Sequence, residues 1–209
     1  MKNPLHYQLS EYDCGPTAML NAISFLFERE EIPPEIIRNI MLYSLDCYGS
    51  GGTPGKAGTS RMAMMFLANW LDGFGRVSEF RISARYVSGK AVHIGQESLI
   101  CDALVRGGCA VVRLFYEVEH YVLLSGMAGD RVKVFDPWYV PADSQEFSGT
   151  GIALVSDHPQ EYNRLVPASF FNREERELYA LGAYPDREAV LLFNERTKKT
   201  AADTIEYFI

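Results

Sequence analysis

The sequence lacks the cysteine spacing of a zinc site and the apolar segments of an exported or membrane protein. No two of its four cysteines form a C-x-x-C pair, and four cysteines in 209 residues are too few for a disulfide-stapled domain. The first ten residues contain no signal-peptide core, and no segment approaches the roughly 18 consecutive apolar residues of a membrane helix. We therefore expect a cytoplasmic protein with reduced thiols, no metal or other cofactor, and no membrane partner.

Basic residues are also scarce. Lys and Arg number 20 against 27 Asp and Glu, which gives a formal net charge of −7, and they form no cluster along the chain. Such a protein gains no electrostatic attraction to phosphate backbones, so nucleic acid is not an expected partner. The hydrophobic fraction of 47% and the length are those of one ordinary globular domain.

The first half of the sequence is patterned as helices. Apolar residues recur at helical spacing in segment 14–29, and Asp13 stands at its N-cap position. A second helix is expected over 33–41, and a third over 59–70, where a Thr or Ser caps its start. The Gly- and Pro-rich segment 49–58 predicts a loop between them.

The second half changes to strand-like alternation, with one short helix expected over 97–106. Strands are expected over 77–86, 109–116, 120–127, 131–136, 151–156 and 189–193. Helices first and antiparallel strands later predict an α+β fold, with N-terminal helices packed on a C-terminal antiparallel sheet. We assign residues 1–156 to the domain, and the polar, irregular residues 157–209 to a C-terminal extension packed on it.

The strongest chemical signal surrounds Cys14, the first residue of the first predicted helix. A thiol at this position feels the positive end of the helix dipole, which favours the nucleophilic thiolate. Gly15 beside it is expected to let a substrate approach the sulfur closely. Gln8 lies within reach of the same helix end, where its side-chain N–H and the Cys14 backbone N–H are placed to form an oxyanion hole. The alternative is a buried, inert cysteine beside a surface glutamine.

His120 begins one predicted strand and Asp136 ends the next. A turn centred near 128–129 pairs residue 120 with about 136–138, so the two side chains are expected to meet without any adjustment of register. An imidazole is the base and acid that a catalytic cysteine needs, and a carboxylate can fix its orientation. Taken singly, each residue also fits a structural role, as a strand histidine or an Asp-Pro turn.

Together these residues resemble the C39 peptidases, papain-like cysteine peptidases best known as leader-processing domains of bacteriocin exporters. The matching residues, in the family's order, are Gln8, Asp13-Cys14-Gly15, Gly58-Thr59-Ser60, His120-Tyr121-Val122 and Asp136-Pro137. The resemblance covers about residues 6–138. It implies a papain-like fold with Cys14 as nucleophile, His120 as general base and acid, Asp136 as orienting residue and Gln8 in the oxyanion hole.

The expected activity is a thiol-dependent hydrolase that cleaves a peptide or related amide bond through an acyl-enzyme on Cys14. Two alternatives use the same fold. One is a catalytically silent module that binds a peptide, and the other is an acyltransferase that passes the acyl group to an amine or thiol. Trp138 and Tyr139 fit either the cleft wall or the core, and the sequence does not indicate an oligomeric state.

Overall fold

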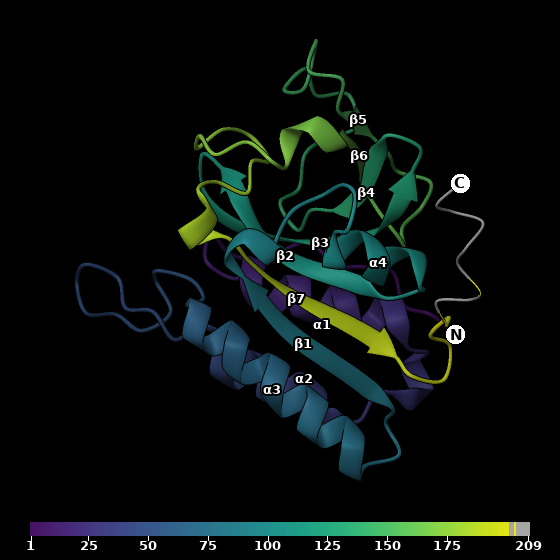
Figure 1. Ribbon diagram of the computed structural model, residues 1–209. Coiled ribbons are helices and arrows are strands. Elements are labelled where there is room, and N and C mark those ends of the chain that lie inside the picture. Colours follow the sequence, from purple (N-terminus) through teal and green to yellow (C-terminus); the bar gives the residue numbers. More distant parts are fainter. Residues whose placement is uncertain (201–202, 204–209) are drawn as a thin grey trace.

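A seven-stranded antiparallel sheet, with strand order β1-β7-β2-β3-β4-β6-β5, organises the structure (Figure 1). The structure is a computed structural model that describes residues 1–200 and 203. The strands are β1 (Ile82–Ser88), β2 (Cys109–Tyr116), β3 (Val118–Ala128), β4 (Arg131–Phe135), β5 (Ala153–Leu154), β6 (Arg164–Pro167) and β7 (Glu188–Asn194). The fold class is therefore α+β, as the sequence pattern predicts.

Helices cover both faces of the sheet. The first three pack together on one face and the fourth packs on the other, where Figure 1 shows it in front of β2 and β3. They are α1 (Cys14–Leu26), α2 (Pro34–Ser44), α3 (Arg61–Val77) and α4 (Leu99–Val105), with short 3-10 turns at Arg29–Glu31, Gly89–Ala91, Ala168–Phe170 and Tyr184–Asp186. None of the helices described is long and apolar enough to cross a lipid bilayer.

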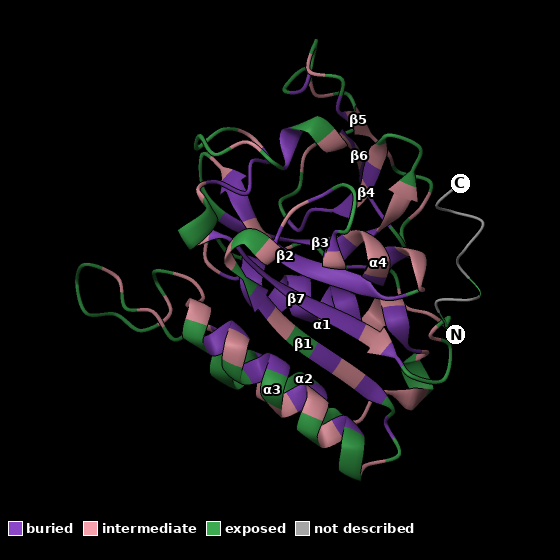
Figure 2. Cartoon of the chain, in the orientation of Figure 1, coloured by how far each residue is buried: buried purple, intermediate pink, exposed green. Residues whose placement is uncertain are grey.

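Strand β2 shows why the sheet is buried on both sides. Cys109 and Val111 pack toward α1, α2 and α3, whereas Ala110, Val112 and Leu114 pack toward α4. All five side chains are fully buried, and Figure 2 shows the central strands as the buried centre of the molecule. A strand covered on both faces reads as a continuous apolar run, and each buried Val or Leu contributes about 1.5–3 kcal/mol.

The predicted boundary between the third helix and the first strand is wrong. Helix α3 begins after Ser60, whose hydroxyl accepts the N–H of Ala63 at 3.1 Å, and it continues to Val77. The side chain of Val77 is 88% exposed, so this valine ends the helix instead of opening a strand. Strand β1 begins only at Ile82, which is buried. An exposed β-branched residue at a helix end imitates the start of a strand.

The segment assigned by sequence to a C-terminal extension takes part in the sheet. Strand β6 pairs with β4, and β7 lies between β1 and β2. The side-chain amide of Asn194, at the end of β7, also donates to the carbonyl oxygen of Leu26 in α1, at 3.1 Å. The polar stretch before β7 has no regular period, so only pairing across distant segments reveals that these residues complete the sheet.

Two glycines of α3 provide a matched test of helix-to-sheet packing. A Cβ at Gly75 would lie 1.8 Å from the carbonyl oxygen of Ile82 in β1, whereas a Cβ at Gly73 meets no atom within 4 Å. Gly75→Ala is therefore expected to lower the free energy of unfolding by about 1–3 kcal/mol. Gly73→Ala is expected to raise it by up to about 1 kcal/mol through helix propensity. Urea unfolding of both variants measures the difference, and equal effects would contradict the close contact.

Candidate active site

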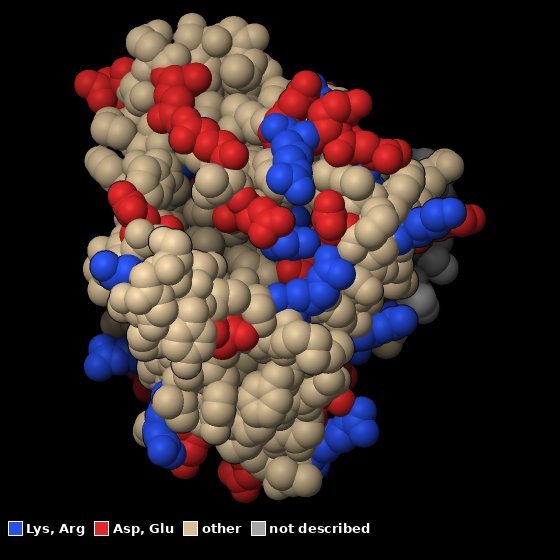
Figure 3. All heavy atoms as spheres, turned by 90° about the vertical axis from the view of Figure 1, so that its left-hand side faces the viewer, with Lys and Arg blue, Asp and Glu red and all other residues tan. Residues whose placement is uncertain are grey.

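Cys14 opens α1 in the wall of a cavity of about 940 Å³. The sulfur-bearing residue is only 8% exposed, and the cavity wall also includes Gln8, Thr59, His120 and Trp138. The β2–β3 turn and the loop between α2 and α3 contribute to this wall, and Figure 3 shows that the corresponding face is hollowed near its centre. The structure therefore brings three of the predicted site residues to one cavity, and the fourth, Asp136, contacts His120 from behind.

Asp13 occupies the N-cap position but does not cap the helix with its side chain. Its carboxylate accepts instead from the backbone N–H groups of Leu9 and Ser10, at 2.9 and 2.7 Å. Burial raises the pKa of Asp13, but hydrogen bonds from Ser10 and the backbone outweigh it and keep the pKa below its usual value. The first N–H groups of α1 therefore have no side-chain cap, which leaves this helix end suited to a developing negative charge.

Gln8 is held at the cavity by its own backbone. Its N–H donates to the carbonyl oxygen of Pro137 at 2.9 Å, which ties the loop of Gln8 to the residue after Asp136. The side-chain amide nitrogen donates one N–H to the carbonyl oxygen of Ser10 at 2.7 Å. A primary amide has two N–H groups, so the second remains for a ligand.

The sequence suggests that Gly15 lets a substrate approach the Cys14 sulfur, but the structure gives this glycine a different role. A Cβ at this position would lie 2.2 Å from the side-chain oxygen of Thr59. The absent side chain therefore makes room for Thr59, which packs against the first turn of α1, and not for a substrate. Thr59 of the Gly-Thr-Ser segment thus helps to position α1, the helix that begins at Cys14, by direct contact.

The hairpin of β3 and β4 contains a bulge that the sequence prediction does not include. The ladder pairs Gly126 with Lys133 but Leu124 with Val134, so Ser125 is an extra residue on β3. The expectation that the register needs no adjustment is therefore wrong. Because side chains alternate between the two faces of a strand, one extra residue exchanges the faces of everything beyond it.

This bulge brings the two predicted partners together. If β3 lacked the extra residue Ser125, His120 and Asp136 would project from opposite faces of the sheet. With the bulge, both side chains project from the same face. The Nε2 atom of His120 then lies 2.8 Å from Oδ1 of Asp136, and both side chains are buried. The prediction that these two side chains meet is confirmed, by a different local geometry from the one expected.

His120 interacts with both of its predicted partners. Its Nε2 is engaged by Asp136, so the other ring nitrogen is the one available to Cys14. Burial lowers the pKa of His120, but the charge and hydrogen bond of Asp136, and then those of Cys14, raise it to about 10. The imidazole is therefore protonated at neutral pH when it faces Cys14.

The Asp136 carboxylate is fully buried and every side of it is occupied. Oδ1 also accepts the backbone N–H of Trp138 at 2.8 Å, while Oδ2 accepts the hydroxyl of Tyr179 at 2.7 Å and the guanidinium of Arg164. Burial raises the pKa of Asp136, but the charges of His120 and Arg164 outweigh burial and lower it to about 2. The group is an anion at every physiological pH.

Sequence reasoning did not identify the residues that hold Asp136. Asn163 accepts the backbone N–H of Asp136 at 2.9 Å and donates to its carbonyl oxygen at 2.8 Å, and Arg164 and Tyr179 bind its carboxylate. All three follow residue 156, in the segment set apart as an extension. Their only sequence signal is an arginine within the apolar pattern of β6.

The aromatic residues after Asp136 divide between two places. Trp138 is 40% exposed and lines the cavity. Tyr139 is 61% exposed, and its ring packs edge-on against Tyr7 with centroids 5.0 Å apart. Neither is a core residue, which resolves the choice that the sequence left open.

Polar atoms without partners gather at the same cavity. Among the described residues, three buried side-chain atoms have no hydrogen-bond partner: Oε1 of Gln8, Oγ1 of Thr59 and the hydroxyl oxygen of Tyr116. All three residues line the cavity. An unpaired buried polar group costs about 1–3 kcal/mol, so their concentration here points to a polar ligand.

Neither the family models nor the curated proteins provide a match for this sequence. Any assignment of function therefore rests on the residues and geometry of the cavity.

The charge partners of His120 give a titration test. Removing the carboxylate in Asp136→Asn is expected to lower the pKa of His120 from about 10, and Cys14→Ala is expected to lower it by less, since Asp136 is the stronger cause. The ring C–H signals of His120 in a proton NMR titration measure both shifts. Identical titrations of all three proteins would contradict the contacts described.

The free energy of unfolding is expected to depend on the ionisation of His120 and Asp136. Because the pKa of His120 is raised, its contribution to the free energy of unfolding is complete below the ordinary value of 6.5. This contribution is lost as pH rises through about 10. The contribution of a lowered aspartate pKa is present above 3.8 and is lost as pH falls through about 2. Thermal unfolding of the wild type across this range is expected to show losses at both ends.

Proposed function

We propose that the protein is a thiol-dependent hydrolase with a papain-like fold, which cleaves a peptide or related amide bond through an acyl-enzyme on Cys14. The observation that carries this proposal is the buried His120, which pairs with Asp136 at 2.8 Å on one side and interacts with Cys14 on the other. A nucleophile, a base and an orienting group in this relation form the triad of acyl-transfer enzymes.

The reaction would proceed in two halves. The Cys14 thiolate attacks the amide carbonyl carbon, forming a C–S bond, and the His120 imidazolium gives its proton to the nitrogen as the C–N bond breaks. Water then attacks the thioester carbonyl and transfers a proton to His120. The C–S bond breaks, the acid product leaves, and the thiolate–imidazolium pair is restored.

The helix end supplies stabilisation for the tetrahedral intermediates. The backbone N–H of Cys14 is among the uncapped N–H groups of α1, and Gln8 lines the same cavity with one amide N–H to spare. Two donors aimed at the developing oxyanion typically account for a large share of the rate. Asp136 stays ionised and holds the imidazole, because Arg164 and Tyr179 fix its other oxygen.

The arrangement of elements supports the papain-like fold. Helix α1 carries the nucleophile and packs against β3, the strand that carries His120, within an antiparallel sheet. This division of the triad between a helix and a sheet agrees with the resemblance to C39 peptidases in the residues from Gln8 to Pro137. A silent binding module and an acyltransferase would use the same cavity, but a module that only binds has no need of a fully held triad.

Loss of the nucleophile tests the proposal. In a mixed peptide library, Cys14→Ala is expected to lower the cleavage rate at least about 1000-fold, because the reaction needs the sulfur. Cys47→Ala is the matched control and should keep nearly full activity, since Cys47 lies outside the cavity wall. Mass spectrometry of the products, together with the mass of the Cys14 peptide during turnover, measures rate and acyl-enzyme at once.

Three results would separate the candidates. Equal cleavage by wild type and Cys14→Ala would end the thiol hydrolase proposal. Peptides that bind the wild type and persist uncut for hours would favour the binding module. Acylated amines in place of free acids, when an amine is added, would favour the acyltransferase.

A further inference from the structure

Charged side chains of mostly one sign converge on the cavity. Four carboxylates and two guanidinium groups line it, and they come from segments far apart in the chain. They are Glu11, Glu117, Glu119, Glu146, Arg113 and Arg176. Figure 3 shows acidic groups around the hollow of this face, with basic groups among them. What matters for a ligand is which of these charges are already paired.

Arg113 is committed to partners of its own. Its Nε lies 3.1 Å from Oε1 of Glu188, and one terminal nitrogen lies 2.9 Å from Oε1 of Glu119. Glu188 is 1% exposed, so this pair is shielded from water and holds the guanidinium in place. Arg61 also lies 3.6 Å from Glu188, so two guanidinium groups and two carboxylates balance here, and Arg113 offers no free positive charge.

The other three carboxylates of the wall form no close ion pair, although the Arg164 guanidinium attracts Glu146 from a greater distance. Glu11, Glu117 and Glu146 make no ion pair within 4 Å of any described residue. The remaining cation, Arg176, lies over the ring of Phe115 at 5.4 Å. Outside the ion pairs, three carboxylates thus face one guanidinium, and this excess of negative charge raises the local concentration of cations in the cavity.

The unpartnered polar atoms of the wall add a second, independent observation. Those of Gln8, Thr59 and Tyr116 are all oxygens, and each can accept a hydrogen bond. Ammonium and guanidinium groups only donate hydrogen bonds. Two of the three are hydroxyls, which can also donate, but a cationic donor group would satisfy both the negative charge and the oxygens.

We propose that the cavity selects a peptide that carries a lysine or arginine side chain beside the scissile amide. The inference rests on the proposed function, since it names the substrate class of that same site. The unpaired carboxylates of the wall would supply the attraction, and the buried oxygens would accept from the cation and from the peptide amides. Glu117 and Glu146 are the specificity-determining residues, since neither belongs to the triad or to the oxyanion donors.

Binding can be measured apart from chemistry in the Cys14→Ala protein. Three fluorescent peptides, identical except for lysine, norleucine or glutamate beside the central amide, are titrated by anisotropy. The lysine peptide is expected to bind about tenfold more tightly than the norleucine peptide, and the glutamate peptide more weakly still. Raising NaCl from about 20 to 500 mM should erode the lysine preference and leave the norleucine affinity unchanged.

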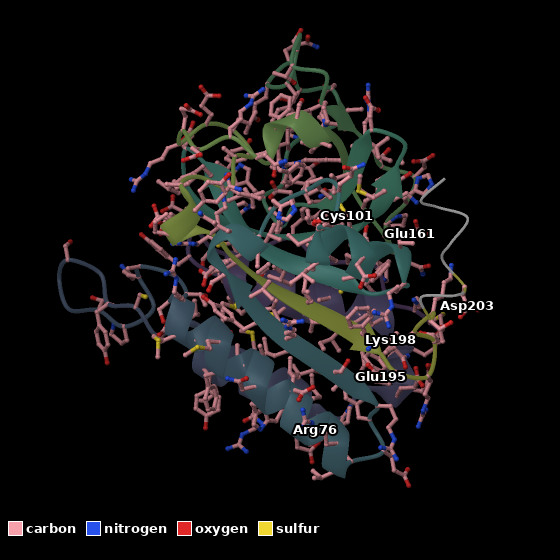
Figure 4. All side chains as sticks on the ribbon, in the orientation of Figure 1. Arg76, Cys101, Glu161, Glu195, Lys198 and Asp203 are labelled. Atoms are coloured by element: carbon pink, nitrogen blue, oxygen red, sulfur yellow. The ribbon has the colours of Figure 1, made fainter. Side chains whose placement is uncertain are left out.

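Substituting single glutamates of the wall by the neutral isostere glutamine shows which carboxylates cause the preference for the lysine peptide. In the same background, Glu117→Gln and Glu146→Gln are each expected to weaken lysine-peptide binding about two- to fivefold, without effect on the norleucine peptide. Glu161→Gln is the matched control. Figure 4 shows Glu161 on the right of its view, the side opposite to the face in Figure 3, where it pairs with Lys133 at 3.5 Å. It should change neither affinity.

Equal binding of the lysine and norleucine peptides, or tighter binding of the glutamate peptide, would overturn the inference. So would free butylamine that binds as tightly as the lysine peptide, because the ligand would then be a small amine. Cleavage by the wild type is measured in parallel on the same peptides. A lysine preference without any cleavage would support the cation selectivity and contradict the hydrolase, whereas cleavage with no charge preference would do the reverse.

Discussion

The structure depends on one buried anion, the carboxylate of Asp136. A charge taken fully out of water costs several kcal/mol unless partners surround it, so the chain folds only in a way that supplies them. His120 comes from the neighbouring strand, Arg164 from β6 and Tyr179 from the loop that follows. Each partner lies on a different segment, and the anion is stable only when all of them are assembled.

This requirement links the site to the whole sheet. Strand β6 must pair with β4 for Arg164 to reach Asp136, and β7 must enter between β1 and β2 to complete the sheet. Arg164 reaches further, because it also donates to the carbonyl oxygen of Trp138 at 2.6 Å, beside the cavity. The second half of the chain therefore holds His120, the proposed base, beside the cavity where the first half places Cys14.

The parts of the site that sequence could predict are those fixed by local pattern. Cys14 at the start of a helix follows from periodicity, and a short hairpin places His120 near Asp136 because few registers are possible. The bulge at Ser125 leaves no mark on composition, although it decides which face His120 occupies. The contacts of Arg164 and Tyr179 with Asp136 could not be predicted for a different reason. They arise from pairing between distant segments, which no local pattern encodes. The same holds for β7, whose apolar run indicates a strand but not its place in the sheet.

Two buried ion pairs, one on each face of the sheet, are separate from the carboxylates of the cavity wall that form no ion pair. Asp136 and Arg164 lie on the face of α4, while Glu188 and Arg113 lie on the face of the first three helices, where the hydroxyls of Tyr86 and Tyr121 also donate to Glu188, each at 2.6 Å. Both anions are compensated inside the protein, so they orient groups without drawing a ligand. The carboxylates of Glu11, Glu117 and Glu146 in the cavity wall form no such close pair, and the cation that we propose for them would leave the two buried pairs undisturbed. The charges that orient His120 and those proposed to attract a cationic substrate therefore belong to separate sets.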